Sequence, residues 1–158
     1  MTNEQKQAYT RRISAANRAQ LITIVFDMTL DYMEDAVRAL DGQDADSFES
    51  ALIHARACLD DLLNSLDMQY ELSFGLRELY LFARKQLIFA QGRRVAEPVS
   101  HARRVIERLR EAWVQIEETD TSEASFDNAQ AVYAGLTYGR GTLNENVADP
   151  KANRGLTV

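Results

Sequence analysis

The stretch that decides the fold is residues 48–66, FESALIHARACLDDLLNSL. Its apolar residues recur in alternating steps of four and three: Phe48, Leu52, Ala55, Leu59, Leu62 and Leu66. Because an α-helix has about 3.6 residues per turn, this spacing places all six side chains along one stripe. Such a stripe needs partner helices against which it can be buried, so the stretch predicts a helical bundle. Asp46, with Glu49 three positions later, is predicted to cap this helix.

The residues before this stretch predict another long helix. Asn17 followed by Gln20 is a capping-box pattern, and Asp41-Gly42 is predicted to end the helix. Two neighbouring apolar stripes run along it, one formed by Leu21, Val25, Met28, Tyr32 and Ala36, the other by Ile22, Phe26, Met33, Val37 and Leu40. The acidic residues fall on the opposite face, which is typical of a helix on the surface of a bundle.

Two more helices are predicted after residue 66. The first begins after Asp67 and ends at Gly92, a residue suited to a left-handed C-terminal cap. The second starts near Glu97-Pro98, because proline is tolerated in a first turn, and repeats the steps of four and three. Its stripe consists of Val99, Ala102, Ile106, Leu109, Trp113 and Ile116.

The fold class that follows is all-α: an antiparallel four-helix bundle over residues 17–118. An N-terminal arm, residues 1–16, is expected before it. A C-terminal extension, residues 119–158, is expected after it, with one short helix at 124–134 and then an irregular, glycine-rich tail.

Composition narrows the classes of partner. The formal net charge of −6 argues against a nucleic-acid binder. No apolar run is long enough for a membrane span, the first twelve residues do not resemble a signal peptide, and the single Cys58 suits a reduced compartment. We therefore expect a cytoplasmic protein without membrane insertion. Charge is nevertheless segregated, because residues 27–67 are mainly acidic and residues 77–110 mainly basic.

The sequence nominates no enzyme site, cofactor or metal. A di-iron bundle needs Glu-x-x-His motifs, and neither His54 nor His101 has an acidic residue three positions before it. One cysteine and two histidines do not supply the usual four ligands of structural zinc. No nucleophile, base and orienting group can be named together, so we expect that the protein is not an enzyme and binds no cofactor.

The third predicted helix is apolar almost all the way round. At 100° per residue, Phe74, Leu81 and Ile88 fall among charged residues and outside the core stripe, with Phe82 and Phe89 on the flank. In a four-helix bundle something further must cover such a helix. A partner polypeptide, a second copy of the chain and the chain's own C-terminal tail are the three candidates.

Several ordered motifs resemble the bacterial flagellin export chaperones of the FliS family. The resemblance lies in Ala8-Tyr9, Ile13, Ala16, Leu21, Val25-Phe26-Asp27, Leu63-Asn64-Ser65-Leu66-Asp67, Glu78-Leu79-Tyr80, Leu87, Ala90 and Leu109-Arg110-Glu111-Ala112-Trp113, and it covers about residues 8–118. Leu81 and Phe89 stand where members commonly carry polar residues.

The resemblance implies a cytosolic chaperone that binds the disordered C-terminal segment of flagellin, prevents premature polymerisation and aids export. The resemblance also implies the export apparatus as a further partner. The expected contact residues are Leu72, Leu76, Leu79, Tyr80, Leu81, Phe82, Leu87 and Ile88 in a groove, with Tyr9 and Ile13 on an N-terminal arm able to lie over them. For Leu76, Leu79 and Leu87 the simpler alternative is core packing. The alternative function is a homo-oligomeric structural protein that pairs through Phe74, Leu81 and Ile88.

Overall fold

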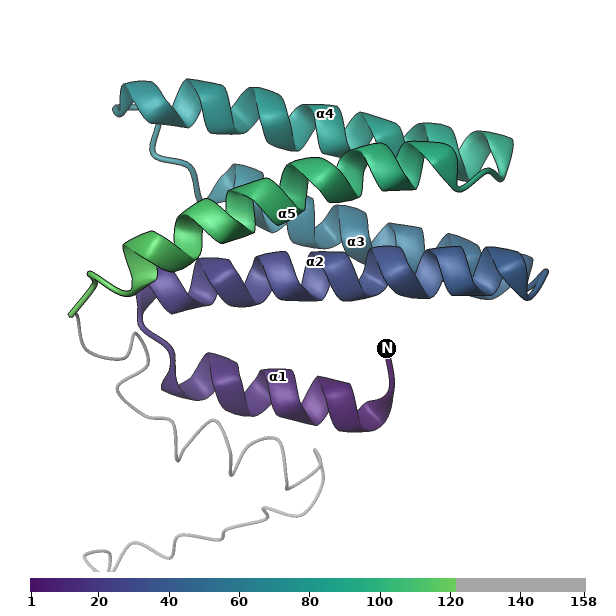
Figure 1. Ribbon diagram of the computed structural model, residues 1–158, viewed down its shortest axis with the longest axis horizontal. Helices are drawn as coiled ribbons and strands as arrows, with labels where there is room; N and C mark the ends of the chain where they lie inside the picture. Colours follow the sequence, from purple (N-terminus) through teal and green to yellow (C-terminus); the bar gives the residue numbers. More distant parts are fainter. Residues whose placement is uncertain (122–158) are drawn as a thin grey trace, which may run out of the picture. The chain divides into compact units, whose positions relative to one another are not determined.

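The computed structural model describes residues 1–121, which form five α-helices and no strand (Figure 1). The helices are α1 (Asn3–Ala15), α2 (Arg18–Asp41), α3 (Ala45–Asn64), α4 (Glu71–Arg93) and α5 (Glu97–Glu117). The all-α prediction is confirmed. The predicted short helix at 124–134 and the glycine-rich tail lie outside the described residues.

Four of the helices form a closed ring. α2 packs against α3 and α5, and α4 packs against the same two helices. Successive helices are joined by short turns and run in opposite directions (Figure 1). Short turns make helices that are consecutive in sequence antiparallel neighbours in space, and each apolar stripe thereby gains the partner helices that it needs. No described helix is long and apolar enough to cross a membrane.

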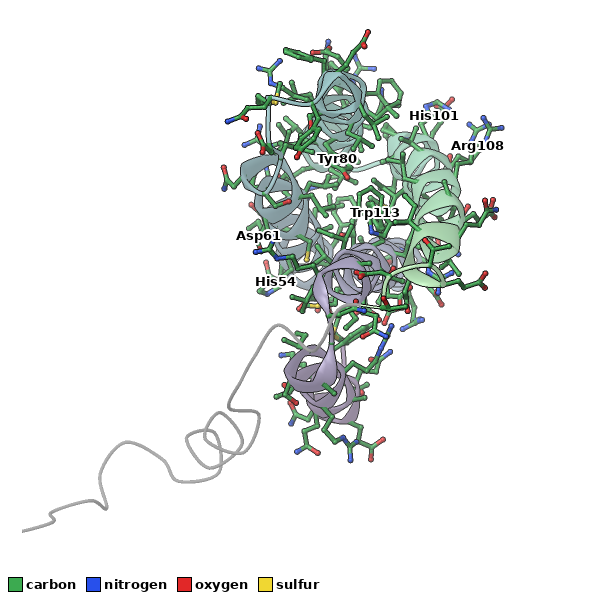
Figure 2. All side chains as sticks on the ribbon, turned by 90° about the vertical axis from the view of Figure 1, so that its left-hand side faces the viewer. His54, Asp61, Tyr80, His101, Arg108 and Trp113 are labelled. Carbon is green, nitrogen blue, oxygen red and sulfur yellow. The ribbon has the colours of Figure 1, made fainter. Side chains whose placement is uncertain are left out.

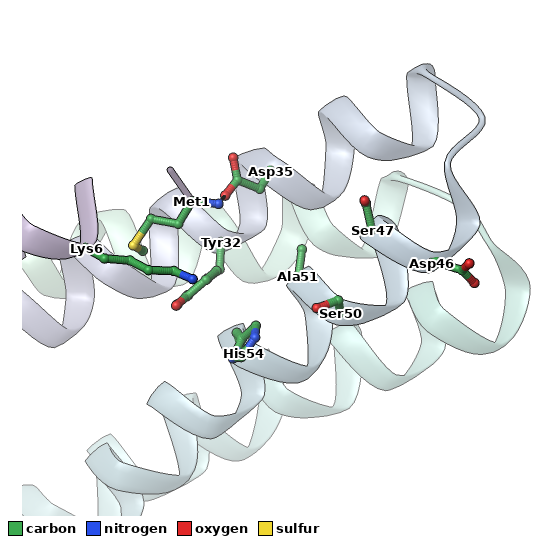
Figure 3. A pocket seen from close by; sticks show the side chains of 9 residues that line it. All are labelled: Met1, Lys6, Tyr32, Asp35, Asp46, Ser47, Ser50, Ala51 and His54. Atoms are coloured by element: carbon green, nitrogen blue, oxygen red, sulfur yellow. Dashed lines mark hydrogen bonds and ion pairs between the residues drawn. The ribbon is translucent and has the colours of Figure 1, made fainter. Parts of the chain in front are cut away.

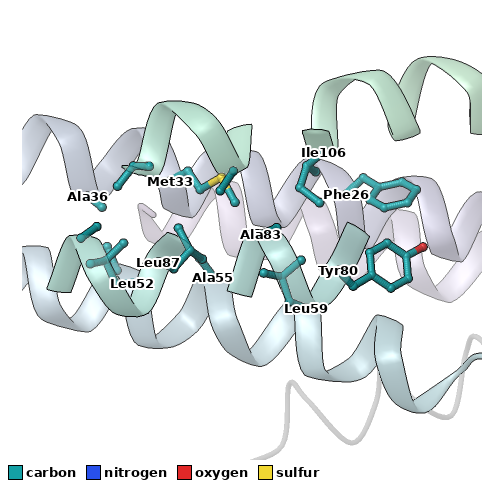
Figure 4. Packing of buried hydrophobic residues seen from close by; sticks show 14 of the residues in the cluster. Phe26, Met33, Ala36, Leu52, Ala55, Leu59, Tyr80, Ala83, Leu87 and Ile106 are labelled. Carbon is teal, nitrogen blue, oxygen red and sulfur yellow. The ribbon is translucent and has the colours of Figure 1, made fainter. Parts of the chain in front are cut away.

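The centre of the ring holds one apolar core (Figure 4). Each helix of the ring supplies side chains that are at most 2% exposed, among them Phe26, Leu59, Tyr80 and Ile106. The stripe of residues 48–66 is buried as predicted: Phe48, Leu52, Ala55, Leu59 and Leu62 are also at most 2% exposed, and Leu66 packs at the edge. The sequence pattern therefore identifies the face of α3 that meets the core.

Two predicted helix starts are confirmed. The side chain of Asn17 accepts a hydrogen bond from the Gln20 amide at 2.9 Å, and the Gln20 side chain accepts one from the Asn17 amide at 2.9 Å. This reciprocal capping box satisfies two amides that have no partner within the helix. Pro98 lies in the first turn of α5, where its missing N–H costs nothing.

Two predicted helix ends are wrong. Asp44, rather than Asp46, caps α3, because its carboxylate accepts a hydrogen bond from the Ser47 amide at 3.0 Å. α4 continues past Gly92 to Arg93, and Arg94 takes the left-handed conformation with φ 53°. Glycine tolerates the left-handed conformation best, but Arg94 adopts it here without being glycine. At Gly92, an added Cβ would meet no atom within 4 Å.

The N-terminal arm is itself a helix, α1. Thr2 and Gln5 form a second capping box at its start, a pattern present in the sequence but not used in the prediction. Among the described helices, α1 contacts α2 and no other. Tyr9 and Ile13 pack there with Ala16 and Ile24 in an apolar cluster separate from the main core. In this structure Tyr9 and Ile13 therefore lie against α2 and not over α4, the third predicted helix.

Candidate polypeptide-binding site

α4 carries six large apolar side chains that are between 40% and 68% exposed. We call this set the α4 outer surface: Leu72, Phe74, Leu79, Phe82, Ile88 and Phe89. Single exposed apolar residues are ordinary, but six of them along one helix are typical of an interaction surface. The prediction that this helix is apolar beyond its core face is confirmed.

The α4 outer surface has two edges, which follow from the helical periodicity. Arg84 and Gln91 contact α3 through Asp60 and Glu49, so they mark the edge of α4 that faces α3. At 100° per residue, Phe74 and Ile88 lie nearer that edge, whereas Leu79 and Phe82 lie nearer α5. The exposed apolar face therefore bridges both neighbours of α4.

A groove opens at one end of the bundle, beside the start of α4. It has a volume of about 650 Å³ and is mainly apolar, and we call it the end groove. The start of α2, the turn between α3 and α4, the first turns of α4 and the end of α5 supply its lining. The side chains that define it are Leu21, Ile22, Leu66, Leu72, Leu76, Tyr80 and Trp113. Arg18 and Asp67 place opposite charges beside it.

Trp113 lines the end groove and also packs against the core. Its ring packs edge-on against Phe26, with ring centroids 6.3 Å apart, and Figure 2 shows it pointing inward from α5. The indole Nε1 is buried and has no hydrogen-bond acceptor within the described residues. A buried donor without an acceptor costs about 1–3 kcal/mol.

Tyr80 belongs to the core and to the end groove together. It is 2% exposed, and its ring centroid lies 6.2 Å from that of Phe26. Burial raises the pKa of its phenol to about 12. The Tyr80 ring is therefore a fixed wall of the groove.

The structure divides the predicted contact residues into three groups. Leu72, Leu76 and Tyr80 meet in the end groove, although Leu76 and Tyr80 are themselves buried. Leu79, Phe82 and Ile88 are exposed on the α4 outer surface, and Leu81 is half-buried beside them. Leu87 is fully buried in the core and Leu76 is 9% exposed, so both fit the simpler alternative of core packing. Leu79 is 40% exposed and does not fit it.

The prediction missed the part of the groove that comes from other helices. Leu21 and Ile22 on α2 and Trp113 on α5 line the end groove, but their stripes were interpreted as core. Each is only partly buried. A stripe position near a helix end has fewer neighbours to cover it. These three residues lie close to residues 17 and 118, the predicted ends of the bundle, and that closeness was the signal that could have indicated their partial exposure.

Tyr9 is held away from both surfaces by polar contacts with α2. Its hydroxyl donates a hydrogen bond to the Asp31 carboxylate at 2.7 Å, and the guanidinium of Arg12 contacts Asp27 at 2.6 Å. Burial and the neighbouring carboxylates raise the pKa of the Tyr9 phenol. Asp27 also pairs with Arg110, so one carboxylate links α1, α2 and α5.

A second cavity, of about 410 Å³, lies beside α1, α2 and α3, and its lining is about equally polar and apolar (Figure 3). The imidazole of His54 stacks on the ring of Tyr32, with ring centroids 5.0 Å apart. No hydrogen bond within residues 1–121 joins His54 to Ser50 or to the carboxylates of Asp35 and Asp46. These side chains therefore do not form a nucleophile–base pair in this geometry.

Metal and thiol chemistry are equally unsupported in the described part. Residues 1–121 contain no group of three His, Cys, Asp or Glu side chains that could hold a metal ion. Cys58 is buried, and burial raises the pKa of its thiol to about 11. A buried thiol with a raised pKa is a poor nucleophile near neutral pH.

Comparison with known proteins bears on these surfaces. The model of one family, described as flagellar protein FliS, matches residues 1–120. No curated protein matched the chain. The match spans all five described helices, including α1, α4 and the end groove. The chain belongs to the FliS family of flagellar proteins.

Proposed function

We propose that this chain is a cytosolic chaperone that binds the disordered C-terminal segment of flagellin, prevents its premature polymerisation and aids its export. Membership of the FliS family supports the coarser statement, a flagellar export chaperone that is not an enzyme. The observation that supports the finer statement is the α4 outer surface, with six large apolar side chains at least 40% exposed. A segment that orders only in a filament exposes apolar residues that need such cover.

The length of the α4 outer surface favours a polypeptide over a small molecule. From Leu72 to Phe89 the helix advances 17 residues, or about 25 Å at 1.5 Å per residue. The end groove continues this apolar surface, because Leu72 belongs to both. An amphipathic or extended segment laid along α4 covers the whole length, as in helix-in-groove recognition.

Trp113 supplies the polar part of the interaction in this proposal. A bound backbone offers carbonyl oxygens, and one of these would accept a hydrogen bond from the unpaired indole Nε1. Formation of that hydrogen bond would offset part of the free-energy cost of ordering the bound segment.

Calorimetry with flagellin tests the proposal. We expect binding to full-length flagellin and none to flagellin that lacks its C-terminal segment. Equal binding to both forms, or binding to neither, would contradict the proposed cargo.

Matched variants locate the contact. Leu79→Glu should weaken flagellin binding about tenfold or more, because a charge would replace an apolar contact. Ile53→Glu is the control, since Ile53 is an equally exposed apolar residue on α3. Trp113→Phe removes the donor together with the five-membered part of the indole, so it should weaken binding, and urea denaturation of the free chain measures what the smaller ring costs in stability. Equal effects of Leu79→Glu and Ile53→Glu would remove α4 from the contact.

A homo-oligomeric interaction protein remains the second candidate, because Phe74 and Ile88 are exposed on the outer face of α4. Sedimentation of the wild type and of Leu81→Glu separates the two functions. A wild-type dimer that dissociates in Leu81→Glu supports self-association. A monomer in both cases eliminates it.

A further inference from the structure

A third recess lies between α4 and α5 and combines an aromatic ring with cations. It has a volume of about 280 Å³ and is lined by Phe82, His101, Arg104, Val105 and Arg108, which we call the α4–α5 groove. Figure 2 shows His101 and Arg108 on the outer side of α5. It shares no lining residue with the end groove, so the two recesses are separate places on the bundle.

The two guanidiniums of this groove have no ion-pair partner within residues 1–121. The other arginines of α5 are paired, Arg103 with Glu107 at 2.7 Å and Arg110 with Asp27. Arg104 and Arg108 are exposed and four positions apart. They therefore lie on one face of the helix, with their Cβ atoms about 6 Å apart. Their five-donor planar heads suit bidentate contacts with carboxylates.

The α4 side of the groove extends the cationic surface. Phe82 is 42% exposed, and Phe89 lies two turns further along the same face. Lys85 and Arg93 lie over the Phe89 ring, 5.7 and 5.9 Å from its centroid. Aromatic rings flanked by cations present an apolar contact inside a positive field.

Acidic residues limit the length of this positive surface. On α5, Glu97 lies one turn before His101, and Glu111 lies about one turn after Arg108. On α4, Glu78 lies one turn before Phe82 and pairs with Arg77 at 3.3 Å. The cationic groove therefore covers about two helical turns.

We propose that the α4–α5 groove binds an acidic amphipathic helix of a second protein. Two carboxylates four positions apart on that helix would face Arg104 and Arg108, and an apolar side chain beside them would contact Phe82 and Val105. Charge complementarity supports this occupant, because the groove is a positive site on a chain whose net charge is −6. The site goes beyond the proposed function because Arg104 and Arg108 on α5 lie outside the proposed cargo surface, although Phe82 belongs to both sites.

The probe is a synthetic helix of 18 residues. It carries two Glu residues four positions apart and a Leu beside them on the same side of the helix. A second helix with Lys in place of each Glu is its counterpart. By fluorescence anisotropy the acidic helix should bind at least about tenfold more tightly than the basic one. Hydrogen exchange should show protection within α4 and α5, with α1 unchanged.

Two double variants with equal charge change assign the site. Arg104→Glu with Arg108→Glu should lower affinity for the acidic helix at least about tenfold. Lys6→Glu with Arg11→Glu on α1 should change it less than about twofold, since both residues are exposed and remote from the groove. Circular dichroism checks that both variants remain helical.

Equal binding of the acidic and basic helices, or equal loss in the two double variants, would overturn the inference. Flagellin binding measured on the same proteins keeps the two proposals separate. Intact flagellin binding without acidic-helix binding overturns only the α4–α5 site. Acidic-helix binding without flagellin binding overturns only the proposed cargo.

Discussion

The hydroxyl of Tyr9 donates a hydrogen bond to the carboxylate of Asp31 at 2.7 Å, which joins α1 to α2. Tyr9→Phe removes this bond and keeps the ring. We expect α1 to be destabilised by about 1 kcal/mol, so that its amides exchange roughly five times faster while those of α3 are unchanged. Hydrogen exchange measures this. Tyr70→Phe is the control, because Tyr70 is 67% exposed, and an equal change in both variants would exclude a role for the Tyr9 bond.

Asp27→Asn tests the carboxylate that contacts both Arg12 and Arg110. The side chain of Asp27 is 13% exposed, so its ion pairs are less screened by water than those at the surface. We expect a loss of about 1–3 kcal/mol in the free energy of unfolding, measured by urea denaturation. Asp60→Asn breaks the more exposed pair with Arg84 and should cost less than about 1 kcal/mol. A smaller loss for Asp27→Asn than for Asp60→Asn would be inconsistent with this role.

Leu59→Ala tests the stripe that decides the fold. Leu59 is fully buried at the centre of the ring, so its truncation should lower the free energy of unfolding by about 2–5 kcal/mol. Ile53→Ala on the exposed side of the same helix should change it by about 0.5 kcal/mol or less. Similar losses at both positions would mean that α3 turns a different face to the core.

Cys58 gives a pH dependence with a defined sign. Burial raises the pKa of its thiol from an ordinary 9.0 to about 11, so between these values the folded chain holds a proton that the unfolded chain releases. Stability is therefore expected to fall as pH rises from about 9 to 11. Cys58→Ala should show a shallower fall in urea denaturation at pH 8 and 10.5. An identical fall in both proteins would show that other groups, such as Tyr80, account for it.

The helices of the ring were predictable because each repeats a burial pattern over many turns. Phe48 and Leu59 illustrate this, since the step of four and three residues alone assigns them to one face. Helix ends are set by single side chains, and there the prediction was weaker. Asp44 and Asp46 are both good caps, and only the three-dimensional path of the turn distinguishes them.

The candidate site was predictable only on α4, where apolar residues exceed what a core can bury. Phe74 and Phe82 were identified in this way, and Leu72 was named through the family resemblance. Trp113 was not identified, because its partial exposure depends on where α5 ends relative to α4. The position of Tyr9 was also beyond prediction from spacing. Which helix α1 covers depends on the carboxylates of Asp27 and Asp31.

The closed ring has a topological consequence. Asn17, where the chain enters the bundle, and Asp120, beyond its last helix, come together, with the Asn17 side-chain amide 3.4 Å from the Asp120 carbonyl oxygen. Once α1 and the residues after 120 are removed, such a bundle is expected to tolerate a cut at the turn after Asp41 and a short linker from Asp120 to Asn17. The order of the helices along the chain is therefore separable from their arrangement in space.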